Sequence, residues 1–456
     1  MIVTRWLYSW LMLLAQPLLR RKLRHRGKQE PGYLLHIDER FGRYEDSVPV
    51  WTGVTVWIHA VSLGETRAAG ALVVALRQSI PQMRLLLTHG TATGRAEGAK
   101  LLLPGDLQVW QPWDTASAVL RFFDHFKPGI GILMETEIWP NMVSICQLRR
   151  IPLVLANARM SEKSMRQAQR LIWLSRPAWA AITAVWAQTE ADSERLTQLG
   201  AKVQGVFGNV KFDATPNMSQ LEKGRSWHHS SAKPVVMLAS SREGEEQVLL
   251  NTLKKLLALA LTDKALVAID SIVNKVQWLI VPRHPQRFDE VAGLIQANGF
   301  SVARRSVWGD QAPIVDASNG DQRNCTTLWL GDSLGEMALY YGLAEVALLG
   351  GSYEPLGGQN LIEAAACGCP VVMGQHTFNF AEAAEQAQKA GAALRVADMF
   401  QGVNMAVSLA LNATAQADMA QRAMQFAQTN RGAVAKTVSA VLELLGQQSI
   451  DGAQVI

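Results

Sequence analysis

The chain has 456 residues, of which 48% are hydrophobic and 18% are charged. This composition is that of a globular protein, and the length exceeds what one hydrophobic core usually supports, so we expect two domains. The formal net charge of +5 suits an anionic partner, and a nucleic acid, a phospholipid surface and a phosphorylated substrate all stay open. The four cysteines fit neither a disulfide framework nor a zinc pattern, which favours reduced thiols in a cytosolic setting.

The N-terminal segment, residues 1–27, combines an apolar helix pattern with a cluster of positive charge. Apolar side chains recur at helical spacing, and six of the seven residues 20–26 are basic. Such a helix binds the surface of an anionic membrane, and its basic cluster keeps the following chain on the cytoplasmic side. The apolar stretch is shorter than the roughly 20 residues of a transmembrane helix, so an interfacial helix and a short spanning helix both stay open. The alternative is an amphipathic helix that folds onto the protein's own core.

Beyond residue 27, short apolar runs alternate with helical stretches, which predicts parallel β-strands joined by helices. We expect strands at residues 54–58, 85–87, 130–134, 153–156 and 184–187, and again at 235–239, 278–281, 344–349 and 370–373. The predicted fold class is therefore α/β, with two doubly wound Rossmann-like domains that face each other across a cleft. We place the domains at residues 28–213 and 233–446, with a polar linker at 214–232 and a loose tail at 447–456.

Polar loops follow the predicted strands of the first domain, where a doubly wound sheet binds its ligands. The first loop carries Gly64 and Glu65 at the start of a helix. Gly64 lets a ligand approach closely, and the Glu65 carboxylate is suited to act as a general base toward a hydroxyl. Alternatively, Glu65 only complements the helix dipole, and the sequence does not separate the two roles. Glu135 and Glu137 lie at a later strand end, where burying a carboxylate is costly without a purpose.

The second domain contains several loops that lead into a helix, the arrangement that binds phosphates. Ser240 and Ser241 end one strand, and Arg283 ends another with a guanidinium group that can grip phosphate oxygens. The loops at 331–336 and 350–358 open two further helices, and the second loop is rich in glycine. Turn formation and helix capping are the alternative explanation for each loop taken singly. Taken together, the loops predict a nucleotide site.

The motifs of the chain, in this order, resemble those of the 3-deoxy-D-manno-oct-2-ulosonic acid (Kdo) transferase family of lipopolysaccharide synthesis. The resemblance rests on HAVSLGE, METEIWPN, NARMSEKS, GNVKFD, VPRHPQRF, GDSLGE and GGSYEPLGGQNLIEAAACGCPVVMGQHTFNF, which together span almost the whole chain. It implies a GT-B glycosyltransferase at the cytoplasmic face of the inner membrane, which moves Kdo from CMP-Kdo to an acylated lipid A precursor (lipid IVA). It also implies no dinucleotide cofactor, no catalytic metal and no nucleic-acid partner, and it leaves the oligomeric state open.

The resemblance further implies roles for individual residues. Glu65 matches the general base, and attack from the face opposite the departing CMP predicts inversion. Arg283 and the helix start at Gln359 and Asn360 are expected to bind the phosphate, and Glu363 the ribose. The full donor-binding set comprises Ser240, Ser241, Arg283, His284, Gly331, Ser333, Gly335, Glu336, Gln359, Asn360 and Glu363, and the acceptor-binding set comprises Gly64, Arg67, Arg159 and Lys163.

Two other classes of protein stay open. A GT-B sugar-nucleotide epimerase shares the glycine loop and the ribose-binding glutamate, but has no use for a basic, tryptophan-anchored N-terminus. A membrane-tethered nucleotide-binding module without catalytic activity would explain the charge and the helix starts, and it would tolerate replacement of Glu65.

Overall fold

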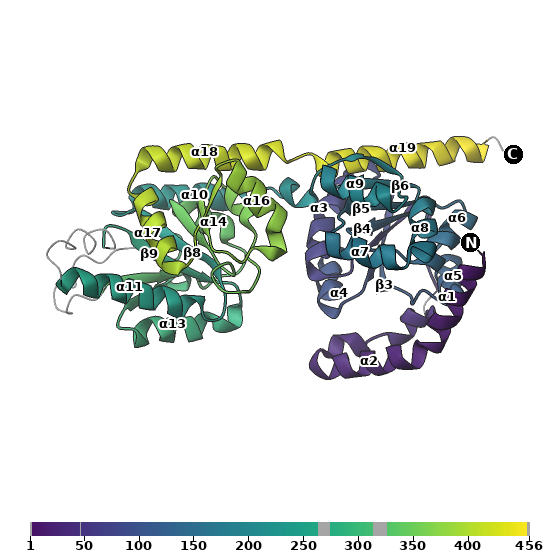
Figure 1. Cartoon of the computed structure of the whole chain (residues 1–456), viewed down its shortest axis with the longest axis horizontal. Coiled ribbons are helices and arrows are strands. Elements are labelled where there is room, and N and C mark those ends of the chain that lie inside the picture. Colours follow the sequence, from purple (N-terminus) through teal and green to yellow (C-terminus); the bar gives the residue numbers. More distant parts are fainter. Residues whose placement is uncertain (1, 46, 263–273, 313–325, 454–456) are drawn as a thin grey trace. The chain divides into compact units, whose positions relative to one another are not determined.

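The computed structural model describes residues 2–45, 47–262, 274–312 and 326–453 (Figure 1). These residues form two compact units, and each unit is built on its own sheet. Unit 1 contains the chain up to Asp213 together with the C-terminal segment from Asn430, and unit 2 contains Ala214–Thr429.

Unit 1 is built on a seven-stranded parallel sheet with the strand order β3-β2-β1-β4-β5-β6-β7. Its strands are β1 (Thr55–His59), β2 (Arg84–His89), β3 (Leu107–Trp110), β4 (Ile130–Met134), β5 (Leu153–Ala158), β6 (Ala184–Ala187) and β7 (Val203–Val206). Buried apolar side chains cover both faces, because Val56 and Ile58 belong to one cluster while Trp57, between them, belongs to another. We did not predict β3 and β7, which form the two edges of the sheet.

The helices of unit 1 pack on both faces of this sheet. They are α1 (Ile2–Leu14), α2 (Gln16–Gln29), α3 (Leu63–Ser79), α4 (Ala92–Gly98), α5 (Ala116–Phe126), α6 (Pro140–Leu148), α7 (Glu162–Arg170), α8 (Ile172–Ala181), α9 (Glu190–Gln198) and α19 (Ala433–Ala453). Several begin at a hydroxyl residue that accepts a backbone N–H of the first turn, as Ser62, Thr91 and Thr115 do. The helices that follow β1 and β2 therefore start directly at the strand ends, where the sequence predicts ligand-binding loops.

The C-terminal helix α19 belongs to unit 1, although we expected residues up to 446 in the second domain and a loose tail beyond. Its apolar residues Ala433, Val434, Val438 and Val441 join the core cluster of unit 1. The Asp213 carboxylate fixes its start by accepting the N–H of Gly432 at 2.5 Å and that of Val434 at 2.6 Å. Leu444 and Leu445 of the same helix pack against this cluster and are partly buried.

Unit 2 is built on a second seven-stranded parallel sheet, with the order β10-β11-β9-β8-β12-β13-β14. Its strands are β8 (Val235–Ser241), β9 (Gln277–Pro282), β10 (Ser301–Arg304), β11 (Thr327–Leu330), β12 (Val346–Leu349), β13 (Val371–Met373) and β14 (Ala393–Arg395). The two parallel sheets confirm the predicted α/β, doubly wound class. In each sheet the strands that follow the first one along the chain are added on one side of it, and the later strands are added on its other side. The strand order thus reverses at β1 in unit 1 and at β8 in unit 2, and such a switch point is where these sheets bind ligands.

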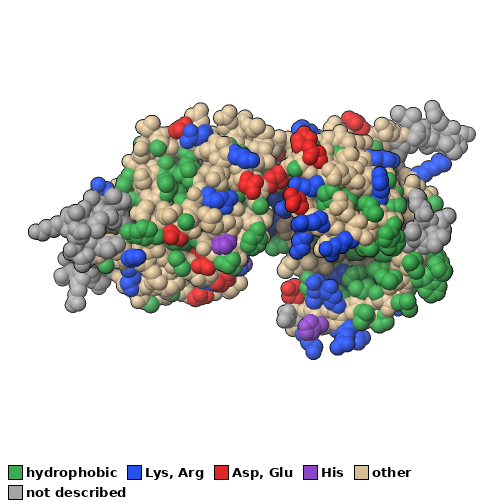
Figure 2. All heavy atoms as spheres, viewed as in Figure 1, with side chains coloured by type: hydrophobic (Ala, Val, Ile, Leu, Met, Phe, Trp, Pro, Cys, Tyr) green, Lys and Arg blue, Asp and Glu red, His purple; other side chains and the backbone are tan. Residues whose placement is uncertain are grey.

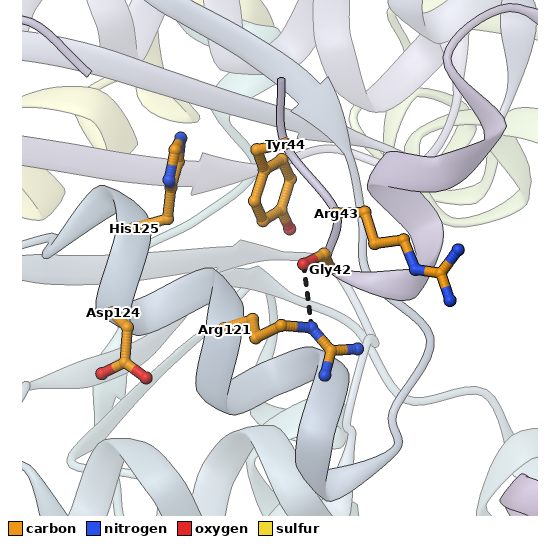
Figure 3. Close-up of a pocket in the computed structure, with 6 residues that line it drawn as sticks. All are labelled: Gly42, Arg43, Tyr44, Arg121, Asp124 and His125. Atoms are coloured by element: carbon orange, nitrogen blue, oxygen red, sulfur yellow. Dashed lines mark hydrogen bonds between the residues drawn. The ribbon is translucent and has the colours of Figure 1, made fainter. Parts of the chain in front are cut away.

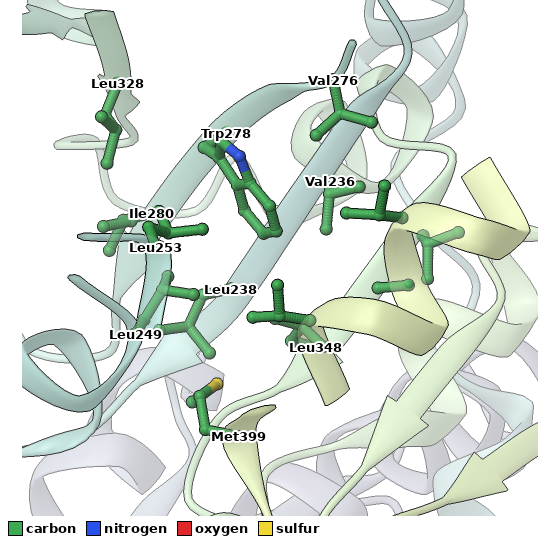
Figure 4. Close-up of a cluster of buried hydrophobic side chains, with 14 of the residues drawn as sticks. Val236, Leu238, Leu249, Leu253, Val276, Trp278, Ile280, Leu328, Leu348 and Met399 are labelled. Atoms are coloured by element: carbon green, nitrogen blue, oxygen red, sulfur yellow. The ribbon is translucent and has the colours of Figure 1, made fainter. Parts of the chain in front are cut away.

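The helices of unit 2 are α10 (Met218–Ser230), α11 (Glu245–Thr262), α13 (Phe288–Ala297), α14 (Met337–Leu343), α15 (Leu361–Ala366), α16 (Ala381–Lys389), α17 (Met399–Ala410) and α18 (Ala413–Thr429). Figure 4 shows apolar side chains of the central strands, such as Leu238 and Trp278, packed against Leu249 of α11 and Met399 of α17. Helix α10 occupies most of the segment that we expected as a linker. It packs along α14, with Leu221 and Trp227 buried.

The N-terminal helix α1 packs on unit 1 through one side only. Ser9 Oγ donates to Asn141 Oδ1 at 2.9 Å, and the Tyr8 hydroxyl bonds to the buried Asp114. Its other apolar side chains are exposed, and Figure 2 shows them as a hydrophobic area beside the basic side chains of α2; they are Trp6, Leu7, Trp10, Leu11, Leu13 and Leu14. Within the described ranges, none of the helices combines the length and the apolar character needed to cross a membrane.

Candidate active site

Glu65 lies in the first turn of α3, directly beyond the end of β1. Its Oε2 accepts the N–H of Val61 at 2.9 Å, and its Oε1 accepts the hydroxyl of Ser62 at 2.9 Å. The Ser62 hydroxyl in turn accepts the Glu65 N–H at 3.4 Å and so caps the helix. Glu65 therefore does serve the start of the helix, and the same bonds hold its carboxyl group in one orientation.

The environment of Glu65 also changes its protonation. Burial raises the pKa of Glu65 to about 7, against the lowering effect of the Val61 N–H, and the charge of Glu135 raises it further. A carboxyl group with a pKa near 7 is well matched to a general base at neutral pH, whereas an ordinary glutamate is a weaker base. Helix capping and proton abstraction are thus compatible roles for this side chain.

The loops after β4 and β5 meet beside this position. The Arg159 N–H donates to the Glu135 carbonyl at 3.2 Å, and the Thr136 hydroxyl donates to the Arg159 carbonyl at 2.6 Å. Glu135 has a left-handed backbone, with φ of 61°, and its carboxylate lies 3.6 Å from Lys211 Nζ. Such a conformation is costly for a residue with a side chain and is common at functional sites. We did not predict Lys211 as a site residue, although it lies in the GNVKFD motif that carries part of the family resemblance.

The expected acceptor residues occupy different environments. Added to Gly64, a Cβ atom would meet only Ser62 Oγ, at 3.9 Å, so packing does not require glycine there and space is left beside Glu65. Arg67 is about half exposed and forms an ion pair with Glu97 at 3.0 Å. Lys163 is exposed in the first turn of α7, two residues beyond the Ser161 cap.

Two buried histidines that sequence analysis did not single out lie beneath the β1 and β2 ends. The Nδ1 of His59 bonds to the Thr88 hydroxyl at 2.9 Å, and the Nδ1 of His89 bonds to the Ala60 carbonyl at 2.9 Å. Burial lowers the pKa of His59 to about 3 and that of His89 to about 4. Both rings are therefore neutral at pH 7 and add no positive charge near Glu65.

The expected donor residues at the ends of β8 and β9 differ in whether their side chains bond within the protein. Ser240 has a left-handed backbone with φ of 54°, and its hydroxyl lies only 3.7 Å from Met337 Sδ, a weak contact that a ligand can replace. Ser241 is fully buried and donates its hydroxyl to Glu246 at 2.7 Å, so its side chain is used inside the protein. Arg283 is partly buried and its N–H donates to the Ser241 carbonyl at 3.0 Å. Burial lowers the pKa of its neighbour His284, and the charge of Arg242 lowers it further.

The side chains of the loop at 331–336 are tied to one another. Glu336 pairs with Arg305 at 2.9 Å and accepts the Ser333 hydroxyl at 2.5 Å. Gly331 is required by packing, because an added Cβ atom would lie 2.8 Å from Tyr340 and Val281. Gly335 has φ of 77° and open space around its Cα atom. The side chains of Ser333 and Glu336 thus shape the loop, and their contact with the donor stays a prediction.

The glycine loop at 350–358 follows β12 and leads into α15. Gly357 and Gly358 have φ of 92° and 74°, which explains why both are glycine. The Gln359 N–H donates to the Gly350 carbonyl at 3.0 Å, and the Asn360 side chain accepts the Ile362 N–H at 3.1 Å.

Glu363 lies in the first turn of α15 and is partly exposed. The loop therefore brings Gln359, Asn360 and Glu363 into one short segment at the end of β12, which pairs with β8.

Two hollows of unit 1 lie away from these strand ends. One, of about 490 Å³, is lined by Gly42, Arg43, Tyr44, Arg121, Asp124 and His125 (Figure 3). Here Arg121 Nε donates to the Gly42 carbonyl at 3.0 Å, and the Tyr44 ring stacks on His125. A neighbouring hollow of about 730 Å³ shares Arg43, Tyr44 and His125. None of the predicted site residues lines either hollow, so neither bears on the chemistry at the strand ends.

The fold and the site together define a class of protein. Two doubly wound units, one with a carboxyl group suited to proton abstraction and one with a glycine loop at its switch point, are those of a GT-B-like glycosyltransferase. The UDP-GlcNAc 2-epimerase of Neisseria meningitidis, solved with UDP-GlcNAc bound, shares this fold at a TM-score of 0.52. That comparison covers 86% of this chain and all of the other, and the identity of 15% establishes the fold alone.

Sequence comparison identifies the family. Residues 35–214 match the family described as 3-deoxy-D-manno-octulosonic-acid transferase (kdotransferase). The 3-deoxy-D-manno-octulosonic acid transferase of Bordetella pertussis is 41% identical over 449 residues, which is 97% of this chain and 96% of the relative. That of Haemophilus influenzae is 31% identical over 438 residues, 94% of this chain and 96% of the relative. The chain belongs to the Kdo transferase family and is a glycosyltransferase, as the motifs predicted.

Proposed function

We propose that this enzyme transfers Kdo from CMP-Kdo to an acylated lipid A precursor in lipopolysaccharide biosynthesis, with inversion at the anomeric carbon. The observation that carries the proposal is the Glu65 carboxyl group, which is held by Val61 and Ser62 and has a pKa of about 7. In the proposed step, Glu65 takes the proton of the acceptor hydroxyl as its oxygen attacks the anomeric carbon. The bond from that carbon to the phosphate breaks, and CMP leaves with the bonding electrons.

We assign the donor contacts to residues at the carboxyl ends of the strands of unit 2, most of which are partly exposed. Arg283, Gln359 and Asn360 receive the phosphate, where positive charge stabilises the leaving group, and Glu363 receives the ribose hydroxyls. Ser240 is kept as a further contact, together with His284 and the backbone of Gly331 and Gly335. Ser241, Ser333 and Glu336 stay in the proposed donor set, and because their side chains bond within the protein, a donor contact there must share or replace an existing bond.

We assign the acceptor to the surface around Glu65. Gly64 leaves room beside the base, and Arg67, Arg159 and Lys163 supply positive charge for the phosphates of the acceptor. A phosphate that binds Arg67 must compete with Glu97, its ion-pair partner. Because this ion pair is exposed, it contributes about 1 kcal/mol or less, so the phosphate can displace it.

We propose that α1 and α2 hold the enzyme at the cytoplasmic face of the inner membrane. Side chains of α1 stay exposed although they are large and apolar, with Trp6 at 62% and Leu11 at 64% exposure. The basic residues of α2 add attraction to an anionic leaflet. Because Tyr8 and Ser9 bond to unit 1, the helix is a fixed part of that unit and presents its apolar side as an interfacial surface. An acylated acceptor stays in the bilayer, so the enzyme must work there.

We further propose that the reaction needs no catalytic metal, because Arg283 and the loop at Gln359 and Asn360 offer positive charge and hydrogen-bond donors to the departing phosphate. Full turnover after dialysis against EDTA supports this part of the proposal, and turnover that returns only on adding a divalent cation contradicts it.

Incubation with the donor alone and then with donor and acceptor separates the candidate functions. A transferase consumes CMP-Kdo in proportion to the acceptor supplied and forms a heavier lipid. An epimerase alters the sugar nucleotide without any acceptor, and a nucleotide-binding module leaves both compounds unchanged.

A further inference from the structure

Glu245, in the first turn of α11, is a fully buried carboxylate to which sequence analysis gave no role. Its Oε2 accepts the N–H of Arg242 at 2.9 Å and that of Gly351 at 2.7 Å, and its Oε1 accepts the N–H of Tyr353 at 3.2 Å. One side chain therefore joins the turn after β8 to the glycine loop after β12.

These two segments lie at the switch point of the sheet. Strands β8 and β12 are paired, with Ala239 opposite Leu349 at their carboxyl ends. The loops beyond them are in close contact, because a Cβ atom on Gly350 would lie 2.4 Å from the Ser240 carbonyl oxygen. The position of the glycine loop relative to Ser240 thus depends on this contact and on the bonds to Glu245.

The bonds to Glu245 also divide the glycine loop into two halves. The N–H groups of Gly351 and Tyr353 are donors of the kind that bind phosphate oxygens, but here a carboxylate already occupies them. The second half is tied to the first, since the Gly358 N–H donates to the Gly351 carbonyl at 2.7 Å and the Gln359 N–H donates to the Gly350 carbonyl at 3.0 Å. Asn379 holds it further, through its N–H to the Gly357 carbonyl at 2.9 Å and its Nδ2 to the Leu356 carbonyl at 3.1 Å. A second anion at the first half would meet a negative charge and find its donors taken.

We propose that Glu245 is a positioning residue of the donor site: it fills the first half of the glycine loop as an internal anion. Through the bonds of Gly358 and Gln359 to that half, it sets the position of the second half, where Gln359 and Asn360 are assigned to the donor phosphate. The inference rests on the proposed function in one respect, namely that unit 2 binds a CMP-sugar. Glu245 does not touch the donor; it acts by fixing the backbone that does.

The test compares Glu245→Gln with wild type in the full-length protein. Glutamine keeps the size of the side chain but places an NH₂ group against a backbone N–H. Because hydrogen bonds to a charged partner are lost or weakened, we expect the Kd for CMP and the KM for CMP-Kdo to rise about tenfold or more. The KM for the lipid acceptor should stay unchanged, and kcat should change much less than the donor KM.

Glu345→Gln is the matched control. Glu345 is a largely buried carboxylate that also accepts a backbone N–H, that of Val235, but it joins β8 and β12 at their amino ends. Its replacement should lower the melting temperature and leave the donor KM unchanged. If Glu245→Gln does not fold, Glu245→Asp keeps the charge at shorter reach and should raise the donor KM by a smaller factor.

The outcomes separate the inference from the function beneath it. If wild type binds no CMP by calorimetry, the proposed function fails. If wild type binds CMP and the folded Glu245 variants bind it equally well, the positioning role is refuted. An equal rise of the donor KM in Glu345→Gln would also refute it, because the effect would then follow from general destabilisation.

Discussion

Replacement of Glu65 by glutamine removes the proposed base while keeping most of its structural contacts. The amide oxygen of the introduced glutamine can still accept the N–H of Val61, and the Ser62 hydroxyl can still cap the helix. Loss of a positioned general base lowers turnover by about 10²–10⁴, which corresponds to roughly 3–5 kcal/mol of activation free energy. We therefore expect kcat to fall at least about a hundredfold, with the affinity for CMP nearly unchanged.

The pH profile supplies an independent test of the same residue. Burial raises the pKa of Glu65 to about 7, so kcat/KM of wild type should rise with pH up to about 7 and then level off. Because the folded-state pKa lies above the unfolded value, the ionised form costs stability as the pH rises through 7. At pH 8 the Glu65→Gln variant should thus melt no earlier than wild type.

The assay measures Kdo transfer to a lipid A precursor between pH 5 and 9, with CMP binding and melting temperature recorded for both proteins. Turnover of Glu65→Gln within about tenfold of wild type would refute the role as a base. A large loss of both activity and melting temperature would instead assign Glu65 to helix capping alone.

Three further predictions concern other parts of the molecule. The double substitution Trp6→Ser and Trp10→Ser should release the protein from vesicles containing anionic lipid. It leaves Tyr8 and Ser9 in place, so the melting temperature should not fall. Unchanged sedimentation with the vesicles would contradict the interfacial helix. The pKa of His59 is about 3 when folded and 6.5 when unfolded, so the stability that this neutral ring contributes is present above pH 6.5 and is lost as the pH falls below it. Wild type should therefore lose stability relative to His59→Asn between pH 6.5 and 4. A constant difference in melting temperature between the two proteins would contradict the assignment. Asp213→Ala should lower the free energy of unfolding by about 1 kcal/mol through loss of the cap on α19, and chemical denaturation with no such loss would show that the two bonds are not stabilising.

Most central strands could be predicted from the sequence because they are buried on both faces. Strand β1, for example, is buried at every position, so its apolar run is continuous. In unit 2, however, β10, β11 and β14 were not predicted, although β11 lies inside the sheet. The edge strands β3 and β7 include partly exposed positions and polar residues such as Gln108 and Gln204, and they carry no such signal. Helix α10 was taken for a linker because its buried stripe is short, with Leu221, Gly224 and Trp227 surrounded by polar residues.

The candidate site shows the same limit at the level of single residues. The sequence places Glu65 and Asn360 at helix starts, because capping depends on residues three or four positions apart. It does not reveal Glu245, since the N–H groups that this carboxylate binds lie 106 and 108 residues further along the chain. Nor does it show that Ser241 and Ser333 use their hydroxyls within the protein, because their partners are defined only by the folded loops.

The most direct test of the proposed function is mass analysis of the lipid after incubation of the purified enzyme with CMP-Kdo and a lipid A precursor. We predict a lipid heavier by one or more Kdo residues, formed together with CMP, and formed at least about a hundredfold more slowly when Glu65→Gln replaces wild type. An unchanged lipid in the presence of intact donor and acceptor would contradict the proposed function, and release of CMP without a heavier lipid would show that the acceptor is a different compound.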